Sequence, residues 1–309
     1  MRIVSLLPSA TEICFALGLG DMVVGVTHEC DYPYEALSKP KITSSKSHDG
    51  LSSREIDTLV RSQLDSSGSI YGLDIEKLEE LKPDLILTQR LCTVCAVSIE
   101  QVQEVAANLS SKPQVVNLEP RTMGEVFQSF KKVAQVCDRS VESAPIIAEM
   151  EARYRNVGHL IRRLRLPTPK VMLLEWIEPP FASGHWIPEI VSKAGGENSI
   201  SFKERPSREI SWKQVIESHV DFLVFAACGM GVGWQKKEIE IILAQHGLTG
   251  LTRESSGTPK MWICDGSQYF SRPGPRLVET TELLATILHP ELLGEFGSKF
   301  RAGMDFERI

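Results

Sequence analysis

Coordinating and ionisable side chains gather directly after the apolar run 23–27. His28, Glu29 and Cys30 follow this run without a gap, and Tyr32 comes two residues later. Successive side chains of an extended chain alternate in direction, so His28 and Cys30 can face the same side but all three cannot face one metal. The pattern fits either a polar loop that is satisfied within the protein or a ligand contact. In the second case His28 would act as a neutral imidazole donor.

Two further thiols, Cys92 and Cys95, form an isolated C-x-x-C pair. A structural zinc site needs four ligands, so this pair would need two more from elsewhere in the chain. A redox pair requires its first thiol near a helix N-terminus, and a helix is predicted to begin just after it, at 97–109. The pair therefore predicts one of three things: a zinc or iron site that His28 and Cys30 could complete, a redox centre, or ordinary thiols in a loop.

Aromatic residues are unusually frequent at the ends of the predicted strands in the second half. One or two such residues would normally belong to the core, whereas five favour an aromatic wall for a flat ligand, formed by at least two of them. The five are Trp176, Trp186, Trp234, Tyr269 and Phe270.

Two polar residues in the second half are further candidates for ligand contact. His185 follows a glycine and precedes Trp186, and it is either a coordinating or hydrogen-bonding group or a surface histidine. Arg272 opens the segment Arg-Pro-Gly-Pro-Arg, where it either meets carboxylates of a ligand or stabilises the turn.

The elements that must position these residues alternate between strand and helix. The first strand, 2–7, runs into a helix at Pro8, where Ser9 and Glu12 have the spacing of a capping box. Ligands of open α/β sheets bind at the carboxyl ends of the strands, so Pro8 and Ser9 are predicted site residues. Arg90 is a third, because it follows the buried strand 83–88.

The alternation is interrupted once and then resumes. Apolar residues recur in steps of three and four between 141 and 165, which predicts one long amphipathic helix. At 1.5 Å per residue this helix would be about 35 Å long. The prediction is an α/β fold of two Rossmann-like lobes: an N-terminal lobe at 2–138, an interlobe helix at 139–166, a C-terminal lobe at 167–290 and a tail at 291–309.

Composition limits the classes of function. The chain has 309 residues and a net charge of −6, which argues against nucleic acid as a partner. Its one basic cluster, Arg162, Arg163 and Arg165, comes late in the predicted long helix, where cations complement the helix C-terminus. No apolar stretch reaches the ~20 residues of a membrane span. The first residues do not resemble a signal peptide, and most of the seven cysteines lie in apolar surroundings. We therefore expect a cytoplasmic protein with reduced thiols.

Sequence motifs of catalysis are missing. The chain contains no nucleophile elbow, P-loop or HExxH motif, so we expect a binding protein and not an enzyme. Gly229, Gly231 and Gly233 have the spacing G-x-G-x-G, which differs from the dinucleotide fingerprint and favours a close backbone approach to a ligand.

Several segments together resemble the class III substrate-binding proteins of ABC importers for iron siderophores and vitamin B12, with the BtuF-like cobalamin-binding proteins as the nearest branch. The matching segments span nearly the whole chain and are 2–12, 17–21, 25–33, 78–87 and 271–277. The first and last of them are the most specific, whereas the Lys-Pro-Asp-Leu-Ile strand is shared by the wider fold.

The resemblance implies two lobes joined by a rigid helix, with the ligand held in a cleft between them. It also implies cobalamin, or a related corrinoid, tetrapyrrole or metal chelate, as the small-molecule ligand. An importer permease would be a partner only if the protein is exported. The alternative is an intracellular metal-trafficking protein or enzyme that uses the cysteine and histidine residues. The oligomeric state is not determined by the sequence.

Overall fold

The computed structural model describes residues 1–45, 48, 50–67, 70–90, 97–246 and 259–309. It divides into two compact units, and the division falls within the long helix, between Glu149 and Met150. Two short segments from the first half of the chain, Ser52–Arg54 and Arg121–Met123, belong to the second unit. The lobe boundaries and the cleft expected from the sequence stay predictions.

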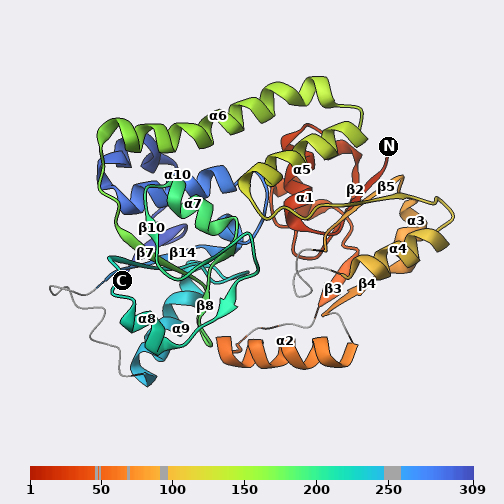
Figure 1. The fold of residues 1–309 in the computed structure, drawn as a ribbon. Helices are drawn as coiled ribbons and strands as arrows, with labels where there is room; N and C mark the ends of the chain where they lie inside the picture. Colours follow the sequence, from red (N-terminus) through yellow and green to blue (C-terminus); the bar gives the residue numbers. More distant parts are fainter. Residues whose placement is uncertain (46–47, 49, 68–69, 91–96, 247–258) are drawn as a thin grey trace. The chain divides into compact units, whose positions relative to one another are not determined.

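The first unit is built on a parallel sheet with the strand order β2-β1-β5-β6 (Figure 1). Strands β1 and β5 are fully buried, as expected for a parallel sheet that is covered on both faces. The strands are β1 (Ile3–Ser5), β2 (Val23–Val26), β5 (Leu85–Thr88) and β6 (Gln114–Asn117); a separate antiparallel pair consists of β3 (Thr43–Ser45) and β4 (Tyr71–Leu73). The helices are α1 (Pro8–Ala16), α2 (Ser53–Ser67), α3 (Ile75–Leu81), α4 (Ile99–Asn108) and α5 (Met123–Val136).

Apolar side chains of β1 and β5 pack against α3 and α4. Val4 and Ile86 lie in one cluster with Leu78 of α3 and Val102 of α4, and all four side chains are almost completely buried. Asp74 accepts a hydrogen bond from the backbone N–H of Lys77 and so caps α3. This packing fixes the carboxyl ends of β1, β2 and β5 next to one another.

The capping box predicted for α1 is wrong. The helix begins at Pro8, its N-cap is Leu7, and no side chain caps it. Proline fits the first helical position because its missing N–H would have no partner there. Ser9 and Glu12 therefore lie inside the helix, where both are buried.

The second unit contains a mixed sheet with the order β12-β8-β7-β13-β14-β15, and β10 also pairs with β7. Its central strands β7, β13 and β14 are parallel. Figure 1 shows α7 and α10 on one side of these strands and α8 and α9 on the other. The strands are β7 (Lys170–Trp176), β8 (Phe181–Ala182), β10 (Glu197–Asn198), β12 (Arg208–Glu209), β13 (Phe222–Phe225), β14 (Lys260–Cys264) and β15 (Phe306–Arg308), with β9 (Gly184–His185) pairing with β11 (Phe202–Lys203) outside this sheet.

The helices of the second unit close its hydrophobic core. They are α7 (Ile187–Lys193), α8 (Trp212–Glu217), α9 (Val232–Gln245), α10 (Leu277–Leu288) and the short α11 (Leu293–Phe296). The long helix predicted at 141–165 is present as α6 (Ser140–Leu164). Its rigidity as a connector stays a prediction.

The last residues differ from the expected tail. Strand β15 runs antiparallel to β14 and adds an edge strand to the sheet. Asp305, just before it, is buried and accepts three hydrogen bonds from Arg301. The sequence after Pro290 mixes polar and apolar residues without a regular alternation, so the pairing of this short strand was not evident without the sheet.

A buried histidine at the end of α10 makes the stability of the second unit depend on pH. The His289 side chain is almost completely buried, and neither ring nitrogen has a hydrogen-bond partner among the described residues. Burial lowers the pKa of His289 below 6.5, and Glu291 and the nearby backbone of Ala194 and Gly195 offset this only in part. The folded protein therefore holds the imidazole neutral.

We expect the free energy of unfolding to fall as the pH drops below about 6.5, because the unfolded chain then takes up a proton that folded His289 does not. The His289→Leu variant should show a flatter profile between about pH 5 and 8, measured by urea denaturation. His159 is exposed, so His159→Gln should reproduce the wild-type profile. Equal pH profiles for wild type and His289→Leu would contradict the prediction.

Candidate ligand-binding site

The loop after β2 holds the best-defined polar cluster of the first unit. His28 donates its backbone N–H to Thr43 Oγ1 at 3.1 Å, and its ring nitrogen Nδ1 lies 2.7 Å from the same oxygen. The Thr43 hydroxyl donates in turn to Thr27 Oγ1 at 2.9 Å. The loop after β2 is thus tied to β3.

Glu29 and Tyr71 complete this cluster. The Tyr71 hydroxyl donates to Glu29 Oε1 at 2.6 Å, and the Tyr71 ring lies 5.2 Å from the His28 ring. Burial lowers the pKa of His28, and Lys41 adds to this, whereas Glu29 and the backbone hydrogen bond to Thr43 act in the opposite direction. The neutral imidazole is therefore the favoured form, and its Nε2 is buried without a hydrogen-bond partner in the described part of the chain.

The other predicted residues of the first unit are placed differently. Cys30 is buried, and its sulfur lies 3.1 Å from the hydroxyl oxygen of Thr11 in α1. Pro8 and Ser9 are buried in the first turn of α1. Arg90 is exposed and pairs with Glu100 at 2.5 Å, so its charge is already engaged. The side chain of Tyr32 is about half exposed, at 48%.

A metal site built from the predicted thiols has no support in the described residues. No three histidine, cysteine, aspartate or glutamate side chains in the described ranges are grouped so that they could hold a metal ion. Cys92 and Cys95 lie outside the described residues. Burial raises the pKa of Cys14 and of Cys264, so these thiols are not activated.

The aromatic residues predicted as a ligand wall separate into two groups. Trp186, Tyr269 and Phe270 are buried, and the Trp186 indole donates to the carbonyl oxygen of Phe270 at 3.1 Å. Burial raises the pKa of Tyr269 to about 12, and its ring packs edge-on against Phe300. These three residues therefore serve the core of the second unit.

Trp176 and Trp234 form the second group and are partly buried. Their ring centres are 6.1 Å apart, and the Trp176 indole donates to the backbone carbonyl of Ser53 at 3.3 Å. Both pack against the core cluster of the second unit: Trp176 is the last residue of β7, and Trp234 lies in the first turn of α9. Of the five aromatics, this pair is therefore only partly buried, and its role as a ligand surface stays a prediction.

His185 combines an unusual backbone with an unpaired ring nitrogen. Its φ is +48°, a conformation that is strained for a residue other than glycine, and its ring stacks on that of Trp186. Its Nε2 is buried and has no hydrogen-bond partner among the described residues. Burial lowers the pKa of His185, and the exposed guanidinium of Arg121 lowers it further.

Arg272 is almost completely buried, with 9% of its surface exposed, and donates to Ser267 Oγ at 3.2 Å. It therefore stabilises the turn after the π-helical segment Gly266–Phe270.

Arg121 was not singled out in the sequence, because it lies between predicted elements. Thr43 and Tyr71 were missed for a related reason: only the pairing of β3 with β4 brings them to His28.

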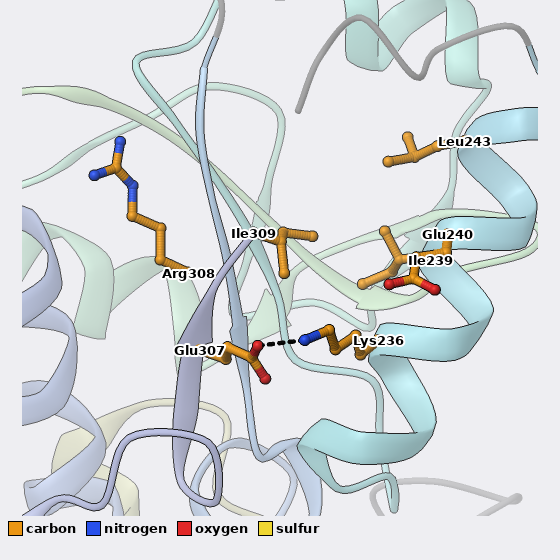
Figure 2. A pocket seen from close by; sticks show the side chains of 7 residues that line it. All are labelled: Lys236, Ile239, Glu240, Leu243, Glu307, Arg308 and Ile309. Carbon is orange, nitrogen blue, oxygen red and sulfur yellow. Dashed lines mark hydrogen bonds and ion pairs between the residues drawn. The ribbon is translucent and has the colours of Figure 1, made fainter. Parts of the chain in front are cut away.

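A cavity of about 430 Å³ lies elsewhere in the second unit, between α9 and the C-terminal strand. Figure 2 shows Ile239 and Leu243 facing Ile309 across it, beside the ion pair of Lys236 and Glu307. None of the predicted site residues lines this cavity.

A family model described as periplasmic binding protein matches residues 3–252, most of the chain. The chain belongs to the periplasmic binding protein family. It is 23% identical over 303 residues to the vitamin B12-binding protein of Vibrio cholerae, with 93% of this chain and 88% of that protein aligned. It is also 23% identical to YvrC of Bacillus subtilis, a substrate-binding lipoprotein of an ABC transporter, with 95% of this chain and 82% of that protein aligned.

Solved structures of this family share the fold. The periplasmic vitamin B12-binding protein BtuF of Vibrio cholerae superposes with a TM-score of 0.61 at 20% identity, covering 93% of this chain and 96% of that chain. A periplasmic haem-binding protein of Pseudomonas aeruginosa gives a TM-score of 0.68 at 16% identity, covering 94% of this chain and 92% of that chain. The two-lobe α/β fold expected from the sequence is thereby confirmed.

No helix in the described residues is long and apolar enough to cross a membrane.

Proposed function

We propose that this protein binds a metal tetrapyrrole, either cobalamin, a related corrinoid or a haem. The observation that carries the proposal is a pair of buried imidazole nitrogens without partners among the described residues, His28 Nε2 and His185 Nε2. Each follows or forms a strand, and each belongs to a ring whose pKa burial lowers. Neutral imidazole is a common donor to the metals that such ligands carry.

Other features of the two units support the same ligand class. Trp176 and Trp234 offer partly buried aromatic surface, which suits the face of a planar macrocycle. Curated relatives that cover nearly the whole chain are named as vitamin B12-binding proteins, and structures of the same fold are named as haem-binding proteins.

The role in the cell follows from the same family. Delivery of the ligand to an ABC importer permease is part of the proposal only if the protein is exported; it is supported by the similarity to YvrC, which is named as an ABC transporter substrate-binding lipoprotein. The cytoplasmic location expected from the first residues stays a prediction that cell fractionation can test. Within the described ranges, which leave out Cys92 and Cys95, no cysteine and histidine cluster supports the alternative of an intracellular metal-trafficking protein or enzyme.

The test is a set of visible-absorption titrations of the full chain with hemin, diaquocobinamide and cyanocobalamin. At least one of them should give a saturable spectral shift with one ligand per chain. An unrelated α/β protein of similar negative charge serves as the control for non-specific binding. Unchanged spectra with all three probes, together with no heat of binding by calorimetry, would refute the proposed function.

A further inference from the structure

The surroundings of His28 determine which of its ring nitrogens carries the proton. A threonine hydroxyl has one hydrogen to donate, and that of Thr43 points to Thr27 Oγ1 at 2.9 Å. Thr43 Oγ1 can therefore only accept from the His28 ring nitrogen that lies 2.7 Å away. Nδ1 must supply the hydrogen, and in the neutral ring Nε2 is then left with a lone pair.

That lone pair has no hydrogen-bond partner in the described part of the chain. Nε2 is buried, and Glu29 Oε1 stands 4.0 Å away, beyond hydrogen-bond range. A carboxylate would in any case repel a lone pair, because both groups are acceptors. Buried polar atoms in native proteins are nearly always paired, so an unpaired one requires an explanation.

We propose that His28 Nε2 coordinates the metal of the bound ligand, and that Thr43 and Thr27 are positioning residues which hold the ring in the required tautomer. The inference rests on the proposed function and narrows the ligand to a metal tetrapyrrole with an exchangeable axial position. The Nε2 lone pair forms a new nitrogen–metal bond. The bond between the metal and its axial water breaks, and the water leaves with the electron pair of that bond. No proton is released, because Nε2 carries none.

Glu29 and Tyr71 control access to this nitrogen. The Tyr71 hydroxyl holds Glu29 Oε1 at 2.6 Å, next to Nε2, and the Tyr71 ring lies at 5.2 Å from the imidazole. The Glu29 side chain is 41% exposed, so it can turn toward solvent when a ligand enters. Replacing Tyr71 with phenylalanine removes the hydroxyl and should speed ligand association.

The tautomer can be tested in the ligand-free protein by ¹H–¹⁵N spectroscopy of the histidine side chains. We expect His28 to show a protonated Nδ1 and an unprotonated Nε2 at a pH above the ordinary histidine pKa, with the signal assigned by its loss in His28→Gln. In Thr43→Val the acceptor is gone, and a mixture of both tautomers is expected. A protonated Nε2 in the wild type would overturn the inference without any ligand experiment.

Coordination is tested by comparing probes that differ at the axial position. Diaquocobinamide has exchangeable axial waters, whereas both axial positions of cyanocobalamin are filled. The wild type should bind diaquocobinamide about tenfold or more tightly than cyanocobalamin, with the spectral shift of nitrogen coordination. Thr43→Val should weaken this binding by about 10–100-fold, as for other residues that orient a metal-ligating histidine.

His28→Ala should lose the coordination shift and bind both probes with equal affinity, whereas His159→Gln, at an exposed position, should behave as wild type. Circular dichroism of each variant confirms folding, and His28→Gln is a second variant that retains a polar side chain. If the wild type binds the probes but His28→Ala keeps the coordination shift, the inference is wrong and the proposed function survives. If no probe binds the wild type, both are wrong.

Discussion

Gly266→Ala is expected to destabilise the second unit by about 3 kcal/mol or more. A methyl group at this position would lie 2.1 Å from the carbonyl oxygen of Ala227 and 2.7 Å from the carbonyl carbon of Ala226. Both are backbone atoms just after β13, so they cannot move aside as a flexible side chain would. Urea denaturation followed by circular dichroism measures the loss as a lower midpoint.

The same substitution should also weaken ligand binding if the second unit contributes to the site. Gly266 donates its N–H to the carbonyl oxygen of Met230, which joins the loops after β13 and β14. Forcing these loops apart would move the start of α9, which carries Trp234. Binding of hemin or diaquocobinamide at a temperature where the variant is still folded reports this effect.

Gly233→Ala is the matched control for Gly266→Ala. Gly233 lies in the first turn of α9, and a methyl group there would meet nothing within 4 Å. Alanine is favoured over glycine in helices, so we expect this variant to be more stable by about 0.5–1 kcal/mol. Equal stabilities of the two variants would show that the contacts around Gly266 are not the cause.

Glu178→Ala should destabilise the second unit by about 2–3 kcal/mol, which is the usual cost when a buried hydrogen-bond donor loses a charged acceptor. The Glu178 carboxylate is almost completely buried and accepts from Trp212 Nε1 at 2.9 Å. It also accepts from Arg54 at 2.7 Å and lies 2.9 Å from His246 Nε2. Removal of the carboxylate leaves the buried indole N–H of Trp212 without this partner, which calorimetric or urea unfolding would detect.

Glu178→Gln separates the loss of the hydrogen bond from the loss of the charge. The glutamine oxygen can still accept from Trp212, whereas Arg54 and His246 are exposed enough to bind water. We therefore expect this variant to recover more than half of the stability lost in Glu178→Ala. Equal losses in both would mean that the charge, and not the acceptor, is what the site requires.

Local features of the fold were predictable because they depend on neighbouring residues. Asp74 and Ser211 precede helices and cap them, and the Ser211 cap is a complete capping box with Gln214. The predominantly apolar strands at 85–88 and 222–225 are buried, as their composition indicates. Ser9 was misread for an equally local reason, since Pro8 takes the first helical position and moves the serine inside the helix.

The candidate site was predictable only in part. The sequence selected His28 because it follows a strand and His185 because it lies between a glycine and Trp186, and each has an unpaired buried nitrogen among the described residues. It could not separate Trp176 from Trp186, since the two have similar sequence surroundings but only the latter is buried in the core.

The sequence by itself determined the alternation of strands and helices, the long helix α6 and the family, because periodicity, capping residues and motifs depend on residues that are close together in the sequence. The tertiary structure alone decided which tautomer His28 holds. That choice depends on Thr43, which contacts the imidazole, and on Thr27, which accepts the hydrogen of the Thr43 hydroxyl. A proton's position follows from the geometry of three side chains in space, and no spacing in the sequence encodes that geometry.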